Sequence, residues 1–255
     1  MLRKSSSTLL TLTVSCFLLW GCASEEQNGV SIDRTPATIP ADAVVITAAN
    51  ASAITIELQK ITKAIRAASN AASKTCAPTG TITLAFLKTI NPANGTISFA
   101  SCKEGNVTTS GALGFDINYY NNNNIDYQLA SYGALSIIDD GDDYKIFGIQ
   151  FAETGENISP KPFPYHRTTA FAVTLNAAIG GGVLVTTGAD IYGASDKCPY
   201  AGTLTVAGAS NSKMIITIGL GQIKIEVDTD TTNNSEGYVE IQGSPFSTPS
   251  SSYCF

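Results

Sequence analysis

The feature that most constrains the fold is a succession of short segments in which apolar and polar residues alternate. In the segment 81–89, Ile82, Leu84 and Phe86 share one face, as the period-two geometry of a half-buried strand requires. Eleven segments of this kind are predicted as strands: 81–89, 96–101, 112–120, 125–138, 144–152, 169–176, 182–192, 202–207, 214–219, 222–228 and 237–242.

Turn-forming residues separate these segments, as in the runs 91–95, 139–143, 180–182 and 208–211. No helical pattern alternates with the strands, so a parallel arrangement with crossover helices is not expected. We therefore predict a mainly β (α+β) fold with an antiparallel meander, built as a half-barrel or sandwich of about 10 strands. One face of the sheet is expected to be exposed to solvent.

One convincing helix precedes the strands, at about residues 51–74. Its apolar residues recur at spacings of four and three and form a single stripe, which predicts that the helix packs on the sheet. Polar side chains that include Glu57, Lys60, Lys63 and Arg66 fall off that stripe, and Asn50 or Ser52 is a candidate N-cap. The stripe consists of Ile54, Leu58, Ile61, Ile65, Ala68 and Ala72.

The N-terminus has the pattern of an export signal. Arg3 and Lys4 precede an apolar run at 9–20, which is shorter than the ~20 residues of a spanning helix. The run ends in Leu19-Trp20-Gly21-Cys22, which resembles the lipobox of bacterial lipoproteins, although Trp20 departs from the small or β-branched residue usual there. The resemblance implies cleavage before Cys22 and a diacylglycerol on its thiol; an ordinary secretory signal is the alternative.

This resemblance divides the chain into a signal peptide (1–21), a polar lipidated tether (22–42) and one β-rich domain (43–255). In the lipoprotein family an aspartate after the lipidated cysteine commonly marks inner-membrane retention, and this chain has Ala23 there. The resemblance therefore implies an outer-membrane protein, with its periplasmic or cell-surface face left open. Two acyl chains provide the stable attachment that one chain does not.

Four cysteines remain after the signal peptide and Cys22 are set aside, an even number that suits an oxidising compartment. Three pairings are possible, and we favour Cys76–Cys102 with Cys198–Cys254, because each pair brackets a local set of strands. A zinc site is the poorer alternative, since the chain has a single histidine and no Cys-x-x-Cys.

Motifs that would name a reaction are missing from the sequence. It contains no Gly-x-Ser-x-Gly, no phosphate-binding loop and no Gly-x-Gly-x-x-Gly. The single histidine, His166, falls in the proline-rich run 160–167, which we interpret as an exposed loop. We therefore predict no catalytic residue and no cofactor.

Two acidic clusters are candidate calcium sites. The run 139–143 is predicted to be a hairpin turn, because Asp and Gly are the residues that tight turns use. In the run 228–236, Asp228, Asp230 and Thr232 have the spacing of the first ligands of a calcium loop. However, Asn233 replaces the required glycine and Val239 stands where the bidentate glutamate belongs, so these three are weak candidates.

Three classes of function remain. Loss of residues 1–21, which carry Arg3 and Lys4 and no acidic residue, would change the formal net charge from −6 to −8. An acidic surface argues against nucleic acid and anionic lipid headgroups as partners. We expect a non-enzymatic envelope lipoprotein with a binding or structural role and an unknown protein or apolar-ligand partner. The first alternative is a carrier of lipid or another apolar ligand, because a helix followed by antiparallel strands looks like the half-barrel lipid and lipoprotein carriers of the periplasm. The second is a hydrolase that uses carboxylates.

Overall fold

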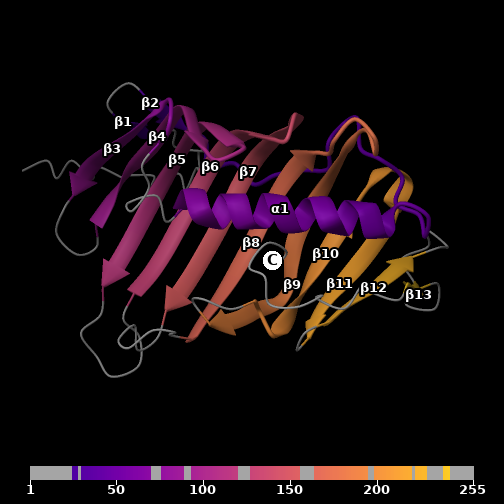
Figure 1. Cartoon of the computed structure of the whole chain (residues 1–255). Helices are drawn as coiled ribbons and strands as arrows, with labels where there is room; N and C mark the ends of the chain where they lie inside the picture. The colour runs from indigo at the N-terminus through magenta and orange to yellow at the C-terminus, as the bar shows by residue number, and fades with distance from the viewer. Residues whose placement is uncertain are drawn as a thin grey trace, which may run out of the picture.

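Eleven antiparallel strands, each hydrogen-bonded to the next, form one sheet in the order β13-β12-β11-β10-β9-β8-β7-β6-β5-β4-β3 (Figure 1). The computed structural model describes residues 25–27, 30–69, 76–88, 93–119, 127–155, 164–194, 198–219, 222–228 and 238–241. The strands are β3 (Thr81–Lys88), β4 (Ala93–Glu104), β5 (Val107–Tyr119), β6 (Tyr127–Asp139), β7 (Asp142–Gly155), β8 (Pro164–Thr174), β9 (Gly182–Ala194), β10 (Ala201–Ala207), β11 (Lys213–Gly219), β12 (Gln222–Asp228) and β13 (Tyr238–Ile241). The sheet is an open meander, and the predicted mainly β fold is confirmed.

The helix α1 (Ala51–Ser69) lies across one face of this sheet and crosses the strands obliquely (Figure 1). Its apolar stripe is buried as predicted, with Ile54, Leu58 and Ile65 fully covered. Residues 70–74 of the predicted helix lie outside the described residues. Before the helix, the Asn50 side chain accepts a hydrogen bond from the Thr47 amide at 2.8 Å and so holds the turn that leads into it.

The hydrophobic core lies between α1 and the face of the sheet that it covers, called here the inner face. Alternate residues of β4 to β12 point to it and join α1 in one apolar cluster. Examples are Leu113 in β5, Ile146 in β7 and Ile216 in β11, all fully buried. Burial of these side chains is the main force that holds the helix on the sheet, because an isolated helix of this length is marginal in water.

The segment before α1 is more ordered than the predicted tether. A short hairpin of β1 (Glu25–Gln27) and β2 (Val30–Ile32) forms a two-stranded sheet. The Arg34 guanidinium then lies 3.8 Å from the centre of the Tyr132 ring. The backbone carbonyl of Arg34 accepts a hydrogen bond from the Gln150 side chain at 3.0 Å. Gly148 has a φ of +58° and leaves room for the backbone of Ala37, so this part of the predicted tether packs against the sheet.

A disulfide joins Cys76 to Cys102 of β4, with 5.0 Å between the Cα atoms, and confirms the first predicted pairing. Backbone hydrogen bonds from Ala77 to Lys103 and from Lys103 to Thr79 run beside it. Cys198 is also disulfide-bonded. Its predicted partner Cys254 lies outside the described residues, so the second pairing stays a prediction.

The remaining elements are the 3-10 turn η2 (Ala209–Asn211) and the hairpin turn between β6 and β7. At that hairpin Asp140 and Gly141 have φ values of +50° and +94°, which confirms the turn predicted for the run 139–143. Within the described residues, no helix is long and apolar enough to cross a membrane.

Candidate functional site

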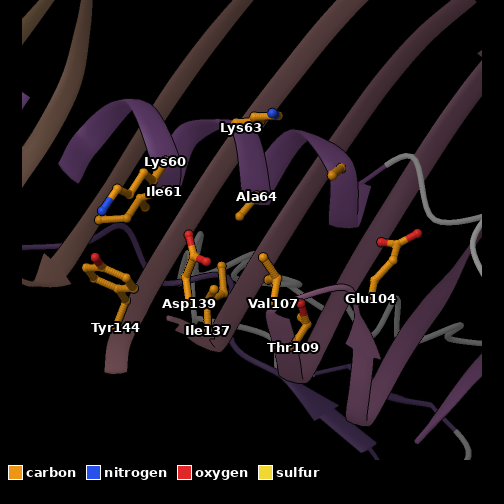
Figure 2. A pocket seen from close by; sticks show the side chains of 11 residues that line it. Lys60, Ile61, Lys63, Ala64, Glu104, Val107, Thr109, Ile137, Asp139 and Tyr144 are labelled. Carbon is orange, nitrogen blue, oxygen red and sulfur yellow. The ribbon is translucent and has the colours of Figure 1, made fainter. Parts of the chain in front are cut away.

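A groove opens between the C-terminal half of α1 and the inner face of the sheet, with a volume of about 230 Å³ (Figure 2). Its helical wall includes Ala64 and Ala67, whose small side chains leave space above the strands. Ile61, Val107 and Ile137 also line the groove. The groove therefore exists because the helix carries alanines where larger residues would have met the sheet.

Charged side chains surround this apolar surface. Lys60 and Lys63 come from α1, whereas Glu104 ends β4 and Asp139 ends β6. Figure 2 shows the Asp139 carboxylate pointing toward α1 from the strand below it. An apolar interior with charges of both signs at its edge suits an amphiphilic ligand better than a purely apolar one.

A buried hydrogen bond between Glu57 and Tyr144 lies beside the groove. The Tyr144 hydroxyl donates to Glu57, and the Lys60 ammonium lies 3.2 Å from the same carboxylate. Burial, followed by the bond to Glu57 and its negative charge, raises the pKa of Tyr144 well above its ordinary value. Tyr144 is therefore a neutral donor at physiological pH, and it fixes the helix to β7.

A second polar cluster connects α1 to β6, β7 and β8. Glu153 accepts a hydrogen bond from Arg66 at 2.8 Å on one oxygen and from the Tyr127 hydroxyl at 2.6 Å on the other. The Arg66 guanidinium also lies 4.2 Å from the centre of the Tyr165 ring. The pKa of Tyr127 is raised mainly by burial of its side chain and secondarily by the negative charge of Glu153. Both Glu153 oxygens are thus occupied, and its side chain is only 1% exposed, so a substrate cannot reach it.

Arg167 is next to this cluster and directly opposite Glu153 in the register of β7 and β8. It is 1% exposed, and Nε, Nη1 and Nη2 have no hydrogen-bond partner among the described residues. Its guanidinium is 5.4 Å from the centre of the Tyr165 ring, whose buried hydroxyl is also unpartnered. Burial lowers the pKa of Arg167.

The proline-rich run was predicted to be an exposed loop, and for residues 164–167 that prediction is wrong. β8 begins at Pro164, a position where a strand tolerates proline, and the next residues alternate between the two faces. Tyr165 and Arg167 are buried, whereas His166 is half-exposed, 3.4 Å from an Asp190 oxygen and stacked on Tyr192.

Sequence reasoning also missed the burial of charged residues on α1. Glu57 and Arg66 were placed off the apolar stripe, yet Glu57 is buried and Arg66 is largely covered. The helix has a second buried stripe of Thr55, Gln59, Thr62 and Ser69 beside the apolar one, and the partly exposed Arg66 lies on the same stripe. Its regular spacing of four and three was the signal that a wider buried surface existed.

The remaining predicted site residues are only partly covered by the structure. Among the residues placed by the structure, no group of three or more His, Cys, Asp or Glu side chains could hold a metal ion. Asp228 is buried at the end of β12, and Asp230 and Thr232 lie outside the described residues. Cys22 also lies outside them, so its lipidation stays a prediction.

Comparisons with known proteins give no match: no family model, curated protein or solved structure matches this chain.

Proposed function

We propose that this chain is a lipid-anchored, non-enzymatic protein that binds the apolar part of an amphiphilic ligand in the groove between α1 and the sheet. The observation that carries the proposal is the groove itself, in which apolar side chains of Ile61, Val107 and Ile137 line a space of about 230 Å³. A ligand seated in such an open groove removes apolar surface from water, which favours binding.

The size of the groove defines what it can hold. Pockets that enclose a whole drug-sized ligand measure ~300–1,000 Å³, and this one is smaller. It suits a segment of an acyl chain or a single ring, with the polar end of the ligand among Lys60, Lys63, Glu104 and Asp139.

A second apolar surface on the inner face supports the same ligand class. Leu84 and Phe86 of β3 lie on that face, beside the sheet edge, and are 38% and 48% exposed. The Phe86 ring contacts Phe115 edge-on, with 5.6 Å between the ring centres, so this surface continues into the core. Exposed aromatic and aliphatic side chains next to a core are typical of surfaces that bind apolar partners.

The predicted anchor matches this role. Lipid on Cys22 would hold the domain beside a membrane, which is the source of acyl chains. Fixed attachment favours capture or presentation of a ligand at the membrane surface over shuttling between two membranes. The hydrolase alternative gains no support from Glu57 or Glu153, because both carboxylates are buried and occupied by tyrosine and cation partners.

Photochemical crosslinking in native envelopes tests the proposal. Cells expressing the full chain are fed a photoactivatable fatty acid, and the labelled fraction of the protein is compared with that of Ala64→Leu, which fills the groove. Ala152→Leu, an exposed alanine on the opposite face of β7, is the matched control. We expect Ala64→Leu to lose most of the label and Ala152→Leu to keep it. Equal labelling of all three proteins would contradict groove binding.

A further inference from the structure

We propose that Arg167 is the centre of a buried oxyanion site on the inner face of the sheet, which takes a phosphate or phosphate-ester group. The site is distinct from the groove, whose lining does not include Arg167 or Tyr165. It does not rest on the proposed function, since inorganic phosphate can test it without any apolar ligand.

Among the described residues, positive charges outnumber negative ones around Arg167. Two guanidinium groups, those of Arg66 and Arg167, contact the same Tyr165 ring, at 4.2 Å and 5.4 Å from its centre. Glu153 is the carboxylate that faces them, and both of its oxygens already accept hydrogen bonds from Arg66 and Tyr127. One buried positive charge is therefore left without a hydrogen-bonded counter-charge among the described residues.

An unpaired buried guanidinium is too costly to be a neutral feature of a fold. An arginine cannot escape the cost by deprotonation, because the guanidinium group keeps its charge in proteins. Removing a charge from water costs several kcal/mol unless hydrogen bonds and an opposite charge replace the lost solvation. An anion that binds here would provide both.

The number of free donors favours a phosphate over a carboxylate. Nε, Nη1 and Nη2 of Arg167 carry five N–H groups, and the Tyr165 hydroxyl adds one more donor. A carboxylate has two oxygens, whereas a phosphate monoester has three free ones and pairs with arginine in bidentate geometry. Within the described part of the chain, buried hydroxyls without partners also occur on α1, β6 and β8, at Thr62, Ser69, Ser131 and Thr169.

Thermal unfolding of the full chain in one non-ionic detergent tests the site. Inorganic phosphate or octyl phosphate replaces chloride at constant ionic strength and pH. The midpoint temperature of unfolding is measured as a function of the phosphate concentration. A ligand that binds only the folded state raises the midpoint steadily as its concentration exceeds the Kd. We expect this rise for the wild type and for Lys145→Met, whose exposed lysine pairs with Asp143 on the opposite face.

Arg167→Met should abolish the rise and should fold at least as well as the wild type without phosphate, because it removes an unpaired buried charge at similar volume. Tyr165→Phe removes only one hydroxyl and should need roughly tenfold more phosphate for the same shift. This second variant keeps the test decisive if Arg167→Met fails to fold.

The two probes distinguish the source of the phosphate group. Equal potency of inorganic phosphate and octyl phosphate would identify a free-ion site, whereas at least tenfold greater potency of octyl phosphate would identify the headgroup of an amphiphile. Either result supports the site. The proposal is overturned if neither probe shifts the wild type, or if Arg167→Met shifts as much as the wild type does. Loss of fatty-acid labelling at the groove would leave this outcome unaffected.

Discussion

Replacing Leu58 with alanine should destabilise the protein strongly, because this residue is central to the contact between α1 and the sheet. Its side chain is fully buried within the apolar cluster that joins α1 to the strands. Burial of a leucine is worth about 1.5–3 kcal/mol, and the cavity left by its truncation adds a further penalty. We therefore expect a loss of about 2–5 kcal/mol in the free energy of unfolding.

Ile56 on the same helix provides the matched control. It is 47% exposed, so Ile56→Ala loses about half of the transfer free energy and leaves no closed cavity. We expect its cost to stay below about 1 kcal/mol. Lys63→Ala, at an exposed position, should stay within about half a kcal/mol.

Urea denaturation of the purified variants measures these differences, with the slope of each transition checked for a common two-state process. Similar losses in Leu58→Ala and Ile56→Ala would show that the stripe does not hold the helix on the sheet. The assignment of a buried and an exposed face to α1 would then be refuted.

Three further predictions concern covalent chemistry and pH. Cys76→Ala should lower the free energy of unfolding by about 3.5 kcal/mol in the chain-entropy treatment of a loop of this length, measured by the same denaturation. Cys22→Ser should leave unprocessed precursor by mass spectrometry, and normal cleavage with release of soluble protein would contradict the lipobox interpretation. Because the pKa of Tyr144 is raised in the folded protein, its contribution to the free energy of unfolding should be fully present below pH ~10 and should decrease above that pH. Relative to Tyr144→Phe, the decrease should be up to about 1.4 kcal/mol per pH unit. Equal slopes for the two proteins above pH ~10 would contradict this.

The order and direction of the strands could be predicted from the sequence because local signals determined them. Alternation such as Ile223, Ile225 and Val227 in β12 sets both the strand and the face it buries. Turn residues such as Asp140 and Gly141 then set the hairpins. An antiparallel meander results when each strand pairs with the next along the chain, which is the usual arrangement of sequential strands.

The polar cluster could not be predicted in this way, because it depends on which residues of different strands become neighbours. Arg167 can be recognised as part of the cluster only from its position opposite Glu153 and beside Tyr165. The nearby prolines concealed the start of β8, since proline is a common marker of loops. Charged residues on α1 were likewise expected in solvent, whereas Arg66 reaches Glu153 beneath the helix.

The groove required the packed structure for the same reason. Ala64 and Ala67 are ordinary helix residues in the sequence, and only the packing of α1 over the sheet shows that they line a groove. The contacts of Arg34 and Ala37 with the sheet could not be predicted either, because the composition of this segment is polar. Arg34 nevertheless finds partners in Tyr132 and Gln150 once the outer face of the sheet exists.

A crystal structure of the full chain with a brominated fatty acid would test groove binding most directly, because anomalous scattering locates the bromine independently of the protein. The account predicts a bromine position between α1 and the sheet, within contact distance of Ala64, Val107 or Ile137. Bromine found only on the outer face, or no ordered bromine at a saturating concentration, would contradict it.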